Sequence, residues 1–230
     1  MGLDPLYWMM MAPVLLLSIW ASIRVKSTFS KYSRVATASG LTGAEVAMQI
    51  LKRNGLTNVS VAETSGFLSD HYDPTKRVVR LSPNVYRSNS IAAIGVAAHE
   101  TGHAVQHAKS YSPLVLRNTM VPIASIGSSM SWIVIIAGFI LGVMGLVKVG
   151  VVLFSAVVLF QLVTLPVEFN ASSRAKEMLA SYGLVSRTEL AGVSRVLSAA
   201  AMTYVAAAAS SIMTLLYFLL RAGILGGSDD

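Results

Sequence analysis

The 230-residue chain is 54% hydrophobic and only 13% charged, which is too apolar for an ordinary soluble domain. It contains no cysteine, which excludes disulfides and thiolate metal sites. The net charge of +7 could suggest nucleic acid, but 16 of the 18 Lys and Arg residues lie in 24–118 and 168–195. This segregation is typical of membrane orientation. We therefore expect a membrane protein with no nucleic-acid partner.

Four apolar runs are each about as long as the roughly 20 residues that a helix needs to cross a bilayer. The expected transmembrane helices cover about 6–23, 124–147, 149–167 and 198–220. Asp4 precedes the first run and basic residues follow it, so we interpret this run as a retained anchor with its N-terminus outside, not as a cleavable signal peptide. The positive-inside rule then places both basic segments in the cytoplasm, where part of their charge would contact anionic lipid head groups.

The remaining segments predict one small α+β domain. In chain order they are a juxtamembrane linker or surface helix at 24–39, a helix at 42–55, a strand at 59–63, two strands around a DPTK turn at 68–82, a helix at 88–109 and further helix in 169–200. The helix at 42–55 carries clear boundary signals. Thr42 is a good N-cap, Glu45 completes a capping box, and Gly55 ends the helix.

Residues 97–107 read AAHETGHAVQH and contain three of the four histidines of the chain. On a helix, His99 and His103 lie on one face about 6 Å apart along the axis, so both can direct a ring nitrogen at one ion. Zinc is the leading candidate for such ligands. Glu100 can reach a zinc-activated water without binding the metal, which is the basis of the HExxH metallopeptidase signature. We expect one Zn²⁺ per chain and Glu100 as general base; the alternative is a chance match on a membrane or core helix.

The third ligand must come from elsewhere in the chain. His107 lies about 12 Å along the axis from His99 on a straight helix, too far to share a zinc ion, and we expect it to pack or hydrogen-bond below the site. Glu168 is the best candidate, because it directly follows the third span and a two-span hairpin returns the chain to the side of the HETGH helix. The alternative is that Glu168 only marks the membrane boundary, and Glu177 is the reserve candidate.

Several segments together resemble the YugP-like neutral zinc metallopeptidases, a bacterial membrane family. The resemblance rests on DHYDPTKRVVRLSPNVY, AAHETGHAVQH and LPVEFNASSRA, with TGAEVAMQIL and LSAAAMTYVAAA nearer the two ends. It covers most of the chain in order. It implies a membrane-embedded zinc peptidase in which His99, His103 and Glu168 are the ligands and Glu100 is the general base.

The chain departs from related patterns at two positions. The more distantly similar HtpX-like membrane metallopeptidases have an aspartate four residues after the ligand glutamate, where this chain has Ser172. In the nearer family an acid is common two residues after it, where this chain has Asn170. An amide can still hydrogen-bond near the metal, but it cannot supply the negative charge that raises the basicity of a histidine.

Two further questions stay open in the sequence. The donor that would stabilise the oxyanion could be any of His71, Tyr72, His107, Tyr111 and Arg174, although His71 could also be a solvated turn residue between Asp70 and Asp73. The segment 77–82 could pair with an extended substrate or be a buried structural strand.

These observations predict an α-helical membrane protein with about four transmembrane helices and a small α+β, gluzincin-like zinc peptidase domain at the cytoplasmic face. Its expected function is endopeptidase cleavage of peptide or protein substrates, membrane-associated ones included, in the cell membrane of a bacterium. The alternative is a membrane scaffold or regulatory protein with a vestigial or structural zinc site. The expected regions are an anchor at 1–23, a catalytic region at 24–118, a membrane hairpin at 119–167, a cytoplasmic helical region at 168–197 and a final membrane helix with its tail at 198–230.

Overall fold

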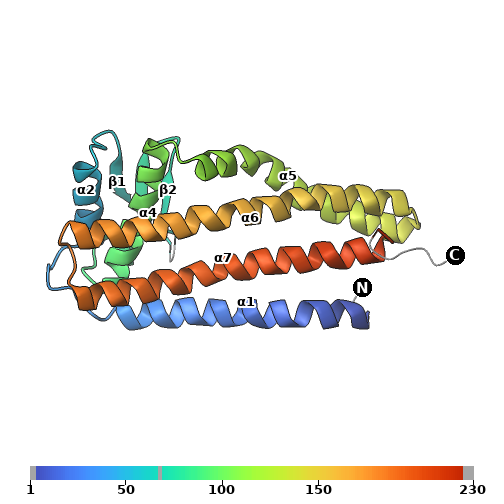
Figure 1. Cartoon of the computed structure of the whole chain (residues 1–230), viewed down its shortest axis with the longest axis horizontal. Coiled ribbons are helices and arrows are strands. Elements are labelled where there is room, and N and C mark those ends of the chain that lie inside the picture. The colour runs from blue at the N-terminus through green and yellow to red at the C-terminus, as the bar shows by residue number, and fades with distance from the viewer. Residues whose placement is uncertain (1–3, 67–68, 225–230) are drawn as a thin grey trace. The chain divides into compact units, whose positions relative to one another are not determined.

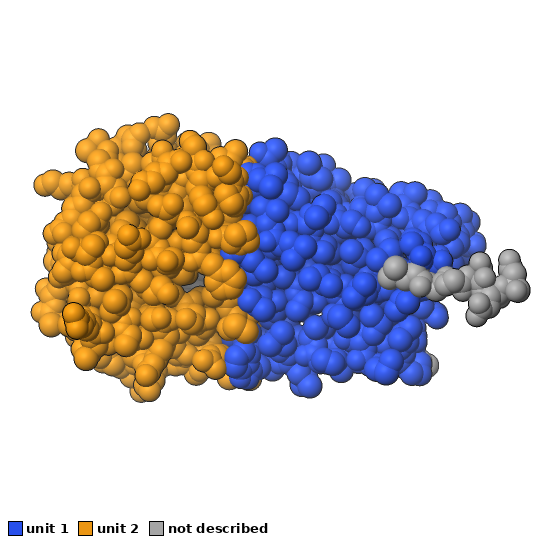
Figure 2. Space-filling model, in the orientation of Figure 1, with its two compact units in different colours: residues 1–21, 116–165, 203–230 blue, residues 22–115, 166–202 orange. Residues whose placement is uncertain are grey.

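The computed structural model describes residues 4–66 and 69–224. In this part of the chain four long helices dominate the architecture (Figure 1): α1 (Pro5–Tyr32), α5 (Ser112–Leu141), α6 (Met144–Ser181) and α7 (Arg187–Arg221). Each of them is long and apolar enough to cross a membrane, which confirms the expected number of apolar spans. The chain divides into two compact units, which Figure 2 colours separately: unit 1 is 1–21, 116–165 and 203–230, and unit 2 is 22–115 and 166–202.

Unit 1 exposes many large apolar side chains. Ile126, Ile140 and Val152 are 63%, 78% and 71% exposed, as befits side chains that face lipid and not water. The hairpin between α5 and α6 turns at Gly142, whose φ of +67° is a left-handed conformation that favours glycine. The span predicted at 124–147 is therefore wrong at its end, because α5 stops at Leu141 and α6 begins at Met144.

Unit 2 contains a three-stranded sheet made of β1 (Ser60–Glu63), β2 (His71–Asp73) and β3 (Val78–Leu81). The strand order is β1-β3-β2, with β1 parallel and β2 antiparallel to β3. The hairpin predicted around the DPTK turn is thus confirmed. Because β3 is hydrogen-bonded on both sides, it has no free edge for a substrate, and of the two interpretations of 77–82 the structural strand is the correct one.

Three shorter helices complete unit 2: α2 (Gly43–Arg53), α3 (Pro83–Tyr86) and α4 (Ile91–Ala108). The predicted capping box begins α2, since the Thr42 hydroxyl accepts from the Glu45 amide and the Glu45 carboxylate accepts from the Thr42 amide at 2.8 Å. Helix α1 continues to Tyr32, so the first half of the predicted 24–39 segment is helical. Helix α4 lies within the helix predicted at 88–109, and it carries both histidines of HETGH, His99 and His103.

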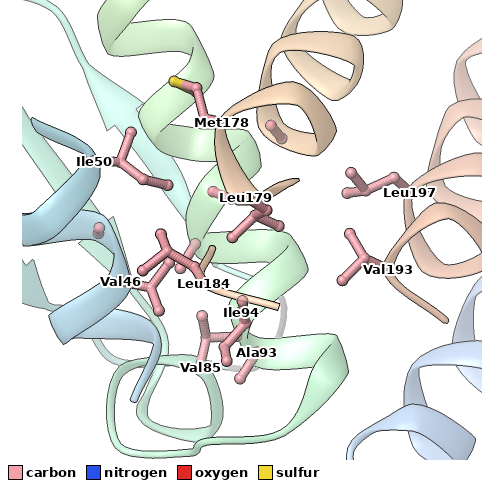
Figure 3. Close-up of a cluster of buried hydrophobic side chains, with 14 of the residues drawn as sticks. Val46, Ile50, Val85, Ala93, Ile94, Met178, Leu179, Leu184, Val193 and Leu197 are labelled. Carbon is pink, nitrogen blue, oxygen red and sulfur yellow. The ribbon is translucent and has the colours of Figure 1, made fainter. Parts of the chain in front are cut away.

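The hydrophobic core of unit 2 joins α2, α4, α6 and α7 (Figure 3). Ile50 of α2, Ile94 of α4 and Leu179 of α6 are fully buried, and Val193 of α7 packs in the same cluster. Burial of one such aliphatic side chain stabilises a fold by about 1.5–3 kcal/mol. This core fixes α4 against the part of α6 that follows residue 166, and those two elements carry the candidate site.

Candidate metal site

Helix α4 presents two histidines on one face. Ser90 caps the helix by accepting from the Ala93 amide at 3.2 Å, and the helix then runs without a break through His99 and His103. Their rings lie edge to face with centroids 4.8 Å apart. His103 is buried and His99 is partly buried, so the site lies between α4 and the elements packed on it.

Glu168 of α6 completes a cluster with the two histidines. Its Oε2 lies 3.2 Å from Nε2 of His99 and 3.5 Å from Nε2 of His103, and one ligand atom from each residue lies within 4.8 Å of the other two. The Glu168 side chain is only 4% exposed. A carboxylate buried this deeply needs a compensating positive charge, either from protonated histidine or from a metal ion.

Helix α6 can approach α4 this closely because residue 102 is glycine. A Cβ atom at Gly102 would lie 2.8 Å from the carbonyl oxygen of Ala171, which is closer than such atoms pack. Ala171 follows Glu168 by three residues on the same helix. The glycine inside HETGH therefore provides the space that lets Glu168 reach the histidines.

Each histidine has a hydrogen-bond partner for its other ring nitrogen. Nδ1 of His99 lies 3.1 Å from the Ser172 hydroxyl, and Nδ1 of His103 lies 2.9 Å from Oε1 of Gln106. The fully buried Gln106 donates through Nε2 to the Val167 carbonyl at 2.9 Å and to Oδ1 of Asn170 at 3.0 Å. These partners orient both rings toward Glu168.

The Gln106 contacts also determine which nitrogen of His103 carries a proton. A carbonyl oxygen can only accept, so the Gln106 amide nitrogen faces Val167 and its oxygen faces His103. Nδ1 of His103 must therefore donate, which leaves the lone pair of a neutral ring on Nε2. That nitrogen and Oε2 of Glu168 are then two acceptors 3.5 Å apart, and they need a proton or a cation between them.

The spacing of these atoms fits zinc. A tetrahedral ion with ligand bonds of about 2.1 Å separates its ligand atoms by about 3.4 Å. The two separations from Glu168 to the histidines, 3.2 and 3.5 Å, are close to this value, and all three ligand atoms lie within 4.8 Å of one another. Two imidazole nitrogens and one carboxylate oxygen are also ligands that zinc accepts, and a site with three protein ligands leaves a position for water or substrate. The residues present therefore fit the metal.

A proton and a metal ion would compete for His103, because its surroundings favour the protonated ring. Burial lowers the pKa of His103, but the hydrogen bond with Glu168 and the negative charges of Glu100 and Glu168 raise it, and the net pKa lies above the usual 6.5. Glu100 is half-buried. Among the described residues, none forms a hydrogen bond or ion pair with its carboxylate, which leaves it available to a water molecule at the cluster.

The other candidate residues lie apart from this cluster. His107 accepts or donates a hydrogen bond of 2.9 Å with the Tyr72 hydroxyl of β2. His71 is exposed, and its Nδ1 lies 2.8 Å from the Ser69 carbonyl oxygen. Glu177, the reserve ligand, is exposed on α6 beside Lys109 and Arg174, away from the histidines.

Arg174 contacts both Tyr111 and Asn170, and Asn170 contacts Gln106, the hydrogen-bond partner of His103. The Arg174 guanidinium lies 5.9 Å from the Tyr111 ring centroid and donates through Nε to Oδ1 of Asn170 at 2.7 Å. Asn170 in turn accepts from Gln106. Sequence reasoning identified Asn170 as a possible hydrogen-bonding partner near the metal but missed Gln106, whose available signal was its position three residues after His103 on the same helix.

Comparison with known proteins agrees with this geometry and confirms the family resemblance. Residues 7–223 match the model of a family described as "Putative neutral zinc metallopeptidase". The chain is 53% identical over 214 residues to the protein of Bacillus subtilis (strain 168) named "Putative membrane protease YugP", which covers 93% of this chain and 94% of that protein. No solved structure matches it. The chain therefore belongs to the neutral zinc metallopeptidase family.

Proposed function

We propose that this chain is an integral membrane zinc endopeptidase, with His99, His103 and Glu168 as the ligands of one Zn²⁺ and Glu100 as general base. The observation that carries the proposal is the convergence of three ligand atoms within 4.8 Å beside a carboxylate that has no partner among the described residues. The site would act in a bacterial cell membrane on peptide or protein substrates, membrane-associated ones included.

The bound ion would supply Lewis acidity toward the scissile carbonyl and lower the pKa of a water molecule. The residues of the chain would transfer the proton and orient the ligands. The carboxylate of Glu100 takes the proton of the attacking water and passes it to the leaving amine. Gln106 and Ser172 hold the two rings by their Nδ1 atoms, so that both Nε2 atoms stay directed at the ligand position of Glu168.

The distribution of charge supports a cytoplasmic position for the site. Sixteen of the 18 basic residues lie in the two segments that carry the site and its surroundings, 24–118 and 168–195. Basic segments next to apolar spans stay on the cytoplasmic side, which supports a site that opens to the cytoplasm.

A second candidate is a membrane scaffold or regulator with a structural zinc site. The neutral side chains of Gln106 and Ser172, in contact with His103 and His99, favour it weakly because they add no negative charge to the ligands. The Glu100 carboxylate disfavours this second candidate, because a purely structural zinc site does not require a general base next to the ligands.

The deciding experiment measures zinc content and cleavage of a peptide library by the full chain in detergent. Glu100→Gln should keep one zinc per chain and lose cleavage by at least about 100-fold, because a general base contributes about that much or more. Glu177→Gln, which removes an exposed carboxylate of the same unit, is the control and should leave both quantities unchanged. Zinc-loaded wild type that cleaves nothing would favour the structural site, and full activity in Glu100→Gln would refute the mechanism.

A further inference from the structure

Unit 2 contains a cavity of about 550 Å³ that shares no residue with the His99, His103 and Glu168 cluster. One wall is the end of α1, and the other is α3 with the two residues that follow it. The polar groups that line it are Lys26, Ser30, Ser33, Asn84, Arg87 and Ser88.

On the α1 wall, Lys26 and Ser30 lie on one face of the helix because they are four residues apart. Ser33 directly follows the last helical residue, and its amide donates to the Phe29 carbonyl at 2.8 Å. Phe29, which is 6% exposed, packs into the core and holds this part of α1 against unit 2. Phe29 therefore contributes a buried apolar part of the cavity lining beside the polar side chains.

The side chains that line the cavity favour an anionic ligand. It contains one ammonium, one guanidinium, three hydroxyls and one amide, and no carboxylate. Arg87 pairs with Glu63 at 2.9 Å, but its side chain is 74% exposed and a guanidinium carries five N–H donors, so donors remain for a ligand. Lys26 is exposed, and among the described residues no carboxylate forms an ion pair with it.

The position of the cavity along α1 selects the kind of anion. The apolar run of α1 ends at Ile23, three residues before Lys26, which places Lys26 about 4.5 Å further along the axis. Ile23 lies on the same face as Lys26 and is 62% exposed. An exposed apolar side chain followed by a cation on the same helix face is typical of the bilayer interface, where acyl chains meet lipid head groups.

We propose that this cavity binds the phosphate group of an anionic glycerophospholipid, with Lys26 and Arg87 as the cations and the serine hydroxyls as further donors. Free phosphate offers the same chemistry, but it makes no use of the exposed apolar face at Ile23. A lipid bound here would join α1 to α3, and it would stabilise the folded protein because the unfolded chain has no such site.

The test uses the full chain in detergent, with short-chain phosphatidylglycerol, phosphatidylcholine of the same chain length and inorganic phosphate as three separate ligands. Binding is measured by native mass spectrometry and by the shift in Tm. Wild type should bind phosphatidylglycerol in preference to the other two. Each removed cation should lower that affinity about fivefold, and both together about 30-fold.

The variants are Lys26→Gln alone and Lys26→Gln with Arg87→Gln. Lys52→Gln with Lys76→Gln is the control, because it removes two exposed cations of the same unit outside the cavity. The single variant breaks no ion pair in the described structure, so its result does not depend on the Arg87–Glu63 pair. An equal loss in the control, equal binding of the two lipids, or equal stabilisation by phosphate alone would overturn the proposal.

Discussion

Gly102→Ala tests how the candidate metal site is formed. The added Cβ would lie 2.8 Å from the Ala171 carbonyl oxygen, whereas ordinary van der Waals contact begins at 3.4 Å, so α6 must move by 0.6 Å (3.4 − 2.8) to restore it. Zinc ligand distances tolerate changes of only about 0.2 Å. Glu168 lies one turn before Ala171 on α6 and would be carried away from the histidines, which are already 3.2 and 3.5 Å from its Oε2.

The substitution should change zinc affinity much more than the free energy of unfolding. Overpacking costs about 1–3 kcal/mol, but alanine gains about 1 kcal/mol in helix propensity over glycine, so the free energy of unfolding should fall by only about 0–2 kcal/mol. Zinc affinity should fall by at least about tenfold, as expected for a displaced ligand set. Titration against a chelating dye measures the affinity, and thermal unfolding of the metal-free protein measures the stability.

The matched control is Gly145→Ala. This glycine also lies in a helix, α6, and it is 23 positions before Glu168 (168 − 145). Among the described residues, no atom outside its own helix backbone and chain neighbours lies within 4 Å of the position that an added Cβ would take. Zinc affinity should equal that of wild type in this variant. Wild-type affinity in Gly102→Ala as well would show that the close approach of α6 is not what places Glu168, and would refute the reasoning.

Three further outcomes follow from the same contacts. Gln106→Leu should lower zinc affinity by about 10–100-fold, measured by the same titration, because His103 loses the acceptor that orients it; unchanged affinity would contradict that role. Glu168→Gln should lose zinc in metal analysis while Glu177→Gln keeps it, and the reverse result would move the third ligand to Glu177. Zinc affinity should fall as the pH drops through the pKa of His103, which is raised above 6.5, because the ligand must be neutral. The stability of the metal-free protein should show the opposite dependence: a raised folded-state pKa stabilises below the unfolded pKa, and this contribution is lost as the pH rises. Parallel pH profiles of affinity and stability would contradict the assignment.

Local signals in the sequence were sufficient for most of the elements. The capping box at Thr42 and Glu45, the DPTK turn and the i, i+4 spacing of His99 and His103 each depend on residues within one or two helical turns or one hairpin. Such interactions are the same in any fold that contains the segment. The four apolar runs are equally explicit, because the length of a membrane helix follows from the thickness of the bilayer.

Tertiary packing decided what local patterns leave undetermined. Strand order made β3 the central strand and removed it as a substrate edge, since pairing with β1 and β2 depends on distant segments. The partners of the histidine Nδ1 atoms were also hidden, because Ser172 lies 73 positions from His99. Even Gln106, only three residues from His103, acquires its orientation from the carbonyl of Val167 on another helix.

The candidate metal site shows which features local sequence determines and which depend on the fold. Composition and the HExxH spacing determine two imidazoles on one helix face and a carboxylate next to the first of them, because helix geometry is independent of context. The approach of Glu168 depends instead on the contact of Gly102 with the α6 backbone at Ala171, where the absence of a side chain allows two helices to meet. Only the folded structure reveals that contact, because a glycine in a sequence does not state which backbone it touches.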